Sequence, residues 1–175
     1  MSKAVTVLFS FLAAALIALS GCATSGPTSA QEAISFYRMG VNRMQSGNNE
    51  AALYEFNRAL AKNPDDENAN FAAGIVHYRQ QNYESAIKSF RKVISINSKN
   101  ADAHNNLALA YIQKKDYPAA IRELRTAIDN PLYQNRALSL INLANIYSLT
   151  GDYEKAAESF REAILVMPES TEAMV

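Results

Sequence analysis

Residues 67–100 read ENANFAAGIVHYRQQNYESAIKSFRKVISINSKN, and this stretch decides the fold because the chain repeats its pattern. Ala86, Phe90 and Val93 stand four and three residues apart, which places them on one face of a helix. Matching residues recur at an offset of 34, and at 36 before the last unit. The four sets are Ala52, Phe56, Ala59 and Pro64; Ala86, Phe90, Val93 and Ser98; Ala120, Leu124, Ala127 and Leu132; and Ala156, Phe160, Ala163 and Pro168.

A second helical segment precedes each of these sets and repeats with the same period. Its copies are Phe36-x-x-Met39-Gly40, Asn70-x-x-Ala73-Gly74, His104-x-x-Leu107-Ala108 and Leu140-x-x-Leu143-Ala144. Between the two segments come Gly47-Asn48-Asn49, Gln81-Asn82-Tyr83, Lys115-Asp116-Tyr117 and Gly151-Asp152-Tyr153. The whole pattern resembles the tetratricopeptide repeat, a helical hairpin with a period of about 34 residues, although its usual tryptophan is replaced in every unit.

The resemblance implies an all-α fold, a right-handed α-solenoid of four helical hairpins. We expect the units at 33–66, 67–100, 101–134 and 137–170, followed by a short tail at 171–175. A residue's repeat position is counted from the first residue of its unit. Gly or Ala at positions eight and twenty lets the two helices of a hairpin approach closely. Because one hairpin cannot bury its apolar face alone, the units are expected to stack.

Residues 1–21 have the layout of a secretory signal peptide, since Lys3 supplies a positive charge and residues 4–19 carry none. Sixteen residues of helix rise about 24 Å, which is short for a bilayer core of about 30 Å. Residues 19–22 (LSGC) resemble the bacterial lipobox, in which the sulfur of the cysteine, here Cys22, receives a diacylglycerol. An ordinary signal peptide followed by a chance cysteine is the alternative.

Lipidation of Cys22 would hold the protein firmly at a membrane, because lipoprotein processing adds more than one acyl chain. Ala23, and not Asp, follows the cysteine, which in Gram-negative lipoproteins implies sorting to the outer membrane. We expect residues 22–32 to form an acylated, flexible linker that reaches roughly 30 Å when extended. The repeats would then face the periplasm of a bacterial cell envelope.

The composition excludes some functions. Basic and acidic residues are equal in number, 17 each, which argues against a nucleic-acid-binding face. Cys22 is the only cysteine, so no disulfide can form within the chain. His77 and His104 occupy positions where repeats of this kind carry packing aromatics, and we interpret them as core residues. Asp65 and Asp66 are interpreted as a helix-start signal.

No catalytic or metal-binding motif stands out. The histidines have no second ligand at metal-site spacing, and no serine sits in a nucleophile elbow. We therefore predict no enzyme activity, no metal and no cofactor other than covalent lipid on Cys22. An enzyme would need an unrecognised polar pocket with perturbed titrating groups, which a structure can test.

The first helix of each unit is expected to line a concave, partner-binding groove. Repeat positions two, five, nine, twelve and thirteen supply the candidates. The chief candidates are Tyr37, Val41, Met44, Asn68, Phe71, Ile75, Tyr78, Asn105, Leu109, Ile112, Ile141 and Asn145, and Ile34, Leu138 and Leu149 occupy the same set of positions. Such an apolar stripe favours a bound peptide or helix, while cover by neighbouring helices or by the chain's own ends is the alternative.

The corner between the third and fourth units suggests a narrower family. Residues 127–133 read AIDNPLY, and a two-residue insertion follows before the helix ALSLINLANIY at 137–147. Together with the lipobox, this corner resembles the type IV pilus biogenesis lipoproteins, the pilotins of PilW/PilF type. That family typically carries about six repeats, whereas four are recognised here. The resemblance implies an outer-membrane lipoprotein that binds secretin subunits and assists their assembly into the pilus pore.

A generic periplasmic adaptor is the main alternative, serving outer-membrane protein insertion or recruitment of a peptidoglycan hydrolase. A third expectation concerns the second helix of the last unit, whose apolar residues are Ala156, Phe160, Ile164 and Leu165. Because a solenoid end without a polar cap leaves apolar surface uncovered, we expect self-association through the C-terminal repeat.

Overall fold

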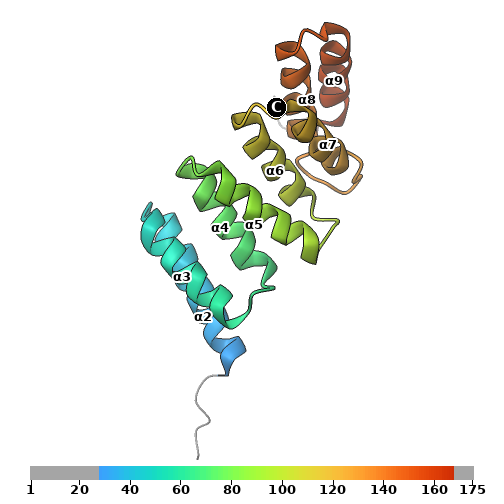
Figure 1. Ribbon diagram of the computed structural model, residues 1–175. Helices are drawn as coiled ribbons and strands as arrows, with labels where there is room; N and C mark the ends of the chain where they lie inside the picture. Colours follow the sequence, from blue (N-terminus) through green and yellow to red (C-terminus); the bar gives the residue numbers. More distant parts are fainter. Residues whose placement is uncertain (1–27, 168–175) are drawn as a thin grey trace, which may run out of the picture.

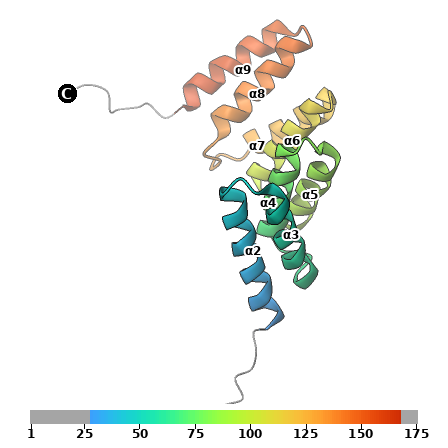
Figure 2. The same ribbon diagram turned by 90° about the vertical axis from the view of Figure 1, so that its left-hand side faces the viewer.

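The computed structural model describes residues 28–167, which form eight α-helices and contain no β-strand. The helices pair into four hairpins that follow one another along the molecule (Figures 1 and 2). Their bounds are α2 Ser29–Gln45, α3 Asn49–Lys62, α4 Glu67–Arg79, α5 Tyr83–Ile96, α6 Ala101–Gln113, α7 Tyr117–Ile128, α8 Arg136–Leu149 and α9 Tyr153–Val166. The predicted all-α solenoid of four hairpins is confirmed.

The first helix begins earlier than expected. The predicted flexible linker at 22–32 is wrong for residues 29–32, which belong to α2. The physical cause is a capping box: the Thr28 hydroxyl accepts a hydrogen bond from the Gln31 amide, and the Gln31 side chain accepts one from the Thr28 amide. The predicted signal peptide at 1–21, Cys22 with the start of the linker, Pro168 and the tail at 171–175 lie outside the described residues.

Each hairpin turns through one residue with a positive φ at repeat position fifteen. These residues are Gly47, Gln81, Lys115 and Gly151, with φ of 77°, 60°, 60° and 83°. The next residue caps the second helix, because its side chain accepts a hydrogen bond from the amide three residues later. These caps are Asn48, Asn82, Asp116 and Asp152.

The core of each hairpin pairs small residues with one large side chain. Ala52 and Ala86, at position twenty, are fully buried, as are the rings of Phe56 and Phe90 at position twenty-four. Gly74 lies so close to Phe90 that an added Cβ would meet the ring's Cε1 at 2.6 Å. Small residues at positions eight and twenty therefore have the packing role that the sequence predicts.

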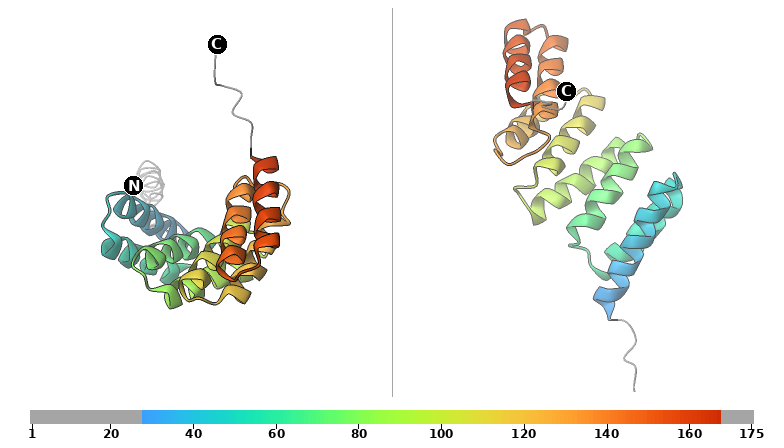
Figure 3. Two further views of the ribbon diagram at one scale, coloured as in Figure 1. Left: turned by 90° about the horizontal axis from the view of Figure 1, so that it is seen from above. Right: turned by 180° about the vertical axis from the view of Figure 1, so that it is seen from behind.

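Stacking joins each second helix to the first helix of the next unit, at the pairs α3–α4, α5–α6 and α7–α8. Seen from above, the stack curves into an arc in which α2 and α8 lie on the inner side of their partners α3 and α9 (Figure 3). Within residues 28–167, no helix combines the length and the apolar character needed to cross a bilayer.

The corner between α7 and α8 absorbs the two-residue insertion. Asp129 ends α7, and Asn135 precedes α8 without making the side-chain cap that the other helix starts have. Tyr133 of this corner is half-buried, and burial together with the Asp102 carboxylate of α6 raises the pKa of its phenol to about 12. Tyr133 is therefore packed beside α6, whereas its neighbours Pro131, Leu132 and Gln134 are exposed.

Candidate protein-binding face

The candidate groove residues belong to α2, α4, α6 and α8, the first helices of the hairpins. Contacts join α2 to α4 and α4 to α6. The Gln113 amide of α6 donates to the Tyr78 hydroxyl of α4 at 3.5 Å, so a predicted groove residue of α4 is in contact with the first helix of the next unit. We call the candidate residues of these four helices the inner face.

Most inner-face residues are half-buried. Tyr37 packs on Phe56 with ring centroids 6.0 Å apart, and Phe71 packs edge-on against Phe90 at 5.7 Å. The half-buried members are Tyr37, Val41, Met44, Phe71, Ile75, Tyr78, Leu109, Ile112 and Ile141, while Asn68 and Asn145 are exposed. Each apolar member therefore anchors the core on one side and offers an edge to the surface on the other.

Asn105 corrects the sequence interpretation. Its side chain is 5% exposed, and its Oδ1 accepts a hydrogen bond of 2.8 Å from the Ser139 hydroxyl of α8. A buried amide oxygen with a partner is a structural link between units three and four, because losing that partner would leave a polar atom unsatisfied. Asn105 is therefore not available to a ligand, and the predicted groove loses its central asparagine.

Apolar exposure on these helices is greatest at the ends of the stack. Ile34 of α2 and Leu138 and Leu149 of α8, at positions two and thirteen of the expected groove, are exposed. In the middle of the inner face, neighbouring helices do cover part of the groove, which is the alternative that the sequence left open. The accessible apolar surface is thus a row of side-chain edges that widens at both ends.

His104 is more than a packing residue. Its Nδ1 lies 2.7 Å from Oε2 of Glu123, and its Nε2 lies 3.1 Å from the carbonyl oxygen of Ser98. Both partners accept hydrogen bonds, so this geometry favours the imidazolium form, in which both ring nitrogens donate. The Glu123 hydrogen bond, opposed by burial, raises the pKa of His104 above its ordinary value.

His77 has the opposite environment. Its Nδ1 is buried and has no hydrogen-bond partner among residues 28–167. Burial lowers the pKa of this imidazole, so the neutral form is favoured. Within the same residues, no cluster of three or more histidine, cysteine, aspartate or glutamate side chains could hold a metal ion.

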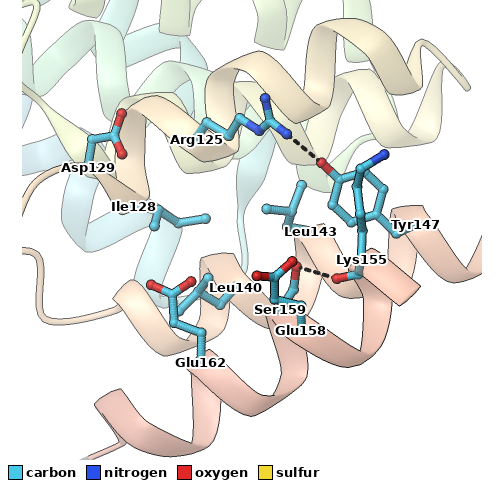
Figure 4. A pocket seen from close by; sticks show the side chains of 10 residues that line it. All are labelled: Arg125, Ile128, Asp129, Leu140, Leu143, Tyr147, Lys155, Glu158, Ser159 and Glu162. Carbon is cyan, nitrogen blue, oxygen red and sulfur yellow. Dashed lines mark hydrogen bonds between the residues drawn. The ribbon is translucent and has the colours of Figure 1, made fainter. Parts of the chain in front are cut away.

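A cavity of about 330 Å³ lies between α7, α8 and α9 (Figure 4). Leu140, Leu143 and Ile128 form its apolar lining, and charges of both signs surround them. The hydrogen bond to Asp152 raises the pKa of the Lys155 amine at its edge, which keeps this lysine protonated. A protonated lysine offers a cation and not a base at this edge of the cavity.

One edge of this cavity carries a contact that the sequence interpretation missed. Nη2 of Arg125 in α7 donates to the Tyr147 hydroxyl of α8 at 2.8 Å (Figure 4). In the preceding units, Nη2 of Arg91 donates to the Tyr111 hydroxyl at 2.6 Å. The signal was present in the sequence, since both arginines stand at repeat position twenty-five and both tyrosines at position eleven.

Solved structures with the same fold include MamA and PilF. A crystal structure of MamA is 18% identical, with a TM-score of 0.73, covering 76% of this chain and 77% of that one. MamA from residue 41 to its end, from Desulfovibrio magneticus RS-1, is 22% identical with a TM-score of 0.73, covering 81% and 78%. PilF of Pseudomonas aeruginosa is 24% identical with a TM-score of 0.72, covering 79% and 63%. At these identities the likeness shows a shared fold.

No curated protein matches the chain in sequence. Family models do match: one described as TPR repeat covers residues 42–81 and 77–115, and one described as Tetratricopeptide repeat covers residues 99–168. Together they extend from α2 to the end of the described residues and agree with the stacked hairpins. The chain belongs to the tetratricopeptide-repeat proteins, which generally act as non-catalytic scaffolds for protein–protein interaction.

Proposed function

We propose that this protein is a lipid-anchored, pilotin-like scaffold that assists assembly of the type IV pilus secretin in the outer membrane. The observation that carries the proposal is the inner face, where half-buried apolar side chains from all four hairpins form one row. Such a row suits a helix or an extended segment of a protein, because either can place side chains against successive units.

Lipidation of Cys22 is the second element of the proposal. The thiol stands directly after a lipobox-like sequence, and α2 begins at Ser29, only seven residues further on. An acylated Cys22 would hold the first hairpin within roughly 25 Å of the membrane surface, from the reach of an extended chain. A secretin subunit on its way into that membrane would pass within reach of the inner face.

The pilus link comes from the corner at residues 127–133, which resembles that of the pilotins. In the structure this corner is a folded connection whose Tyr133 lies beside α6. PilF shares the fold, and this chain spans 63% of the PilF structure. The proposed role is therefore confined to functions that four hairpins can perform.

The proposal is tested in a strain that lacks the gene. Wild-type protein should restore heat-resistant secretin multimers and twitching, whereas Cys22→Ala should not. Asn68→Arg places a cation on the exposed inner face and should lower multimer formation, since an apolar partner segment would have to desolvate it. Tyr54→Arg is the matched control, because Tyr54 is an exposed residue of the second helix α3. Normal multimers and twitching in the deletion strain would overturn the proposal.

A periplasmic adaptor for another envelope assembly is the second candidate, and the anchor and inner face support it equally well. Affinity purification of the lipid-anchored protein separates the two candidates. Recovery of a secretin that is lost with Asn68→Arg supports the pilotin role. Recovery of a peptidoglycan hydrolase or of an outer-membrane insertion component, lost with the same variant, supports the adaptor.

A further inference from the structure

The outer side of α9 carries residues that are covered in every other hairpin. Position twenty-four is fully buried in Phe56, Phe90 and Leu124, but Phe160 is 38% exposed. At position twenty-eight, Ile128 is 8% exposed and Ile164 is 68% exposed. The difference arises because the first helix of a following unit covers the second helix before it, and no described residue does this for α9.

Arg161 adds a polar group to this surface. It stands at position twenty-five, where Arg91 and Arg125 each donate a hydrogen bond to a tyrosine of the following unit, at 2.6 and 2.8 Å. Arg161 is exposed and has no such partner among residues 28–167. We call Phe160, Arg161 and Ile164 the end face.

In the other hairpins, the first helix of the next unit covers the surface that corresponds to the end face. The residues of these covering helices show which side chains the end face would accept. Positions three, seven and ten of α4, α6 and α8 are all buried: Ala69, Ala73 and Val76; Ala103, Leu107 and Ala110; Ser139, Leu143 and Ile146. The same positions of α2, which follows no described unit, are exposed: Ser35, Met39 and Asn42. The preceding unit therefore buries these positions, and their own hairpin does not.

Where the preceding unit has an arginine at position twenty-five, the helix that covers it has a tyrosine at position eleven. Both such helices, α6 and α8, then follow one pattern: a small residue, three residues, leucine, two residues, a small or aliphatic residue, and tyrosine. In α4, which follows a unit with Asn57 at position twenty-five, His77 takes the place of the tyrosine. The arginine and the tyrosine are thus paired across the α5–α6 and α7–α8 interfaces.

We propose that the end face binds, in trans, a helix of another protein with the pattern [Ala/Ser]-x3-Leu-x2-[Ala/Ile]-Tyr. The helix lies on α9 as α6 lies on α5, its leucine and aliphatic residue against Phe160 and Ile164. Its tyrosine hydroxyl accepts a hydrogen bond from Arg161, as Tyr111 and Tyr147 do within the chain. This surface is separate from the inner face, so the inference stands independently of the proposed pilus role.

A second copy of this chain fits the end face poorly. Head-to-tail stacking would place Asn42 where Val76, Ala110 and Ile146 are fully buried, and would leave its amide without a partner. It would also bring Arg43, at position eleven, against Arg161, so two cations would meet where the chain elsewhere pairs arginine with tyrosine. These mismatches speak against head-to-tail stacking of two copies, so we assign the end face to a helix of a different protein.

The test uses a labelled peptide with the sequence of residues 100–115, NADAHNNLALAYIQKK, which carries the pattern. Its binding to the purified full chain in detergent is measured by fluorescence anisotropy. Saturable binding is expected, and Ile164→Asp should weaken it by about tenfold or more, since a buried carboxylate would replace an apolar contact. Leu165→Asp is the matched control: Leu165 is 83% exposed, and its counterparts Ala61, Ser95 and Asp129 are exposed as well.

A second measurement tests the arginine–tyrosine pair. Arg161→Ala should weaken binding of the tyrosine peptide by about three- to tenfold, the range of one typical net hydrogen bond at an exposed site. The same variant should leave binding of a Tyr111→Phe peptide unchanged within about twofold. The inference fails if Ile164→Asp and Leu165→Asp act alike, or if sedimentation shows an oligomer of the full chain that Ile164→Asp dissociates.

Discussion

Gly74 and Phe90 are packed so closely that neither can change size alone. A Cβ on Gly74 would lie 2.6 Å from Cε1 of the Phe90 ring, and one on Gly40 would lie 2.5 Å from Cε1 of Phe56. In the third hairpin the residue at position eight is larger and the residue at position twenty-four is smaller. Ala108 lies opposite Leu124, and both are fully buried. In the first three hairpins, positions eight and twenty-four are therefore matched in size, whereas the fourth combines Ala144 with Phe160, which is 38% exposed.

Gly74→Ala should destabilise the protein by about 1–3 kcal/mol, because the added methyl group overpacks against Phe90. This loss should exceed the gain of about 1 kcal/mol that alanine brings to a helix interior. The double variant Gly74→Ala with Phe90→Leu, which copies the third hairpin, should be more stable than the sum of the two single effects. Urea unfolding monitored by circular dichroism measures all three; strictly additive effects would contradict size matching.

Gln81→Gly and Lys115→Gly should each stabilise the protein by about 0.5–1 kcal/mol. Both residues are exposed and have φ of 60°, a conformation that strains a side chain but not glycine. The first and fourth hairpins already have glycine at this position. Gln80→Gly is the control: its φ is −79°, so the extra freedom of glycine in the unfolded chain should destabilise. Thermal unfolding of the three variants distinguishes these outcomes.

The His104–Glu123 ion pair should stabilise the protein more at acid than at alkaline pH. Since folding raises the pKa of His104, the contribution is fully present below the unfolded value of 6.5 and is lost as pH rises through the folded pKa. Glu123→Gln should therefore reduce stability more at about pH 5.5 than at about pH 8.5. His77, whose pKa is lowered, is present in the wild-type protein and in Glu123→Gln. Its contribution to the pH dependence therefore cancels when the two stabilities are subtracted. An equal difference at both pH values would show that the pair is not charged.

Ser139→Ala should destabilise the protein by about 1–3 kcal/mol, because it leaves the buried Oδ1 of Asn105 without its hydrogen-bond donor. Ser35→Ala is the matched control, since Ser35 occupies the same repeat position in α2 but is exposed, and its loss should change stability by less than about 0.5 kcal/mol. Chemical denaturation measures both. A similar small effect of the two substitutions would mean that the Asn105 link contributes little.

Cys22→Ala should abolish incorporation of labelled palmitate and release the protein from the membrane fraction, because Cys22 is the only thiol that could carry the acyl groups. Ser20→Ala keeps a small residue before the cysteine and should be labelled normally. Unchanged labelling of Cys22→Ala would refute the predicted lipid anchor.

Much of the fold was predictable because the same pattern of packing residues recurs in each of the four units. The 34-residue offset predicted the hairpins, the small residues at positions eight and twenty and the stacking, all of which the structure contains. The inner face was predictable only in part. Its position on the first helices follows from the period, but Asn105 is buried because Ser139 of the next unit reaches it, a contact between residues 34 apart.

By itself, the sequence determined that this chain is a stack of four matched helical hairpins, because periodic side chains encode helix faces wherever they recur. Only the tertiary structure decided which members of each face remain accessible. Asn105, Phe160 and Arg161 occupy repeat positions like any others, yet their exposure depends on whether a neighbouring unit lies against them. The repeated sequence pattern specifies the contacts within a unit, whereas the exposure of a residue depends on where its unit lies in the stack.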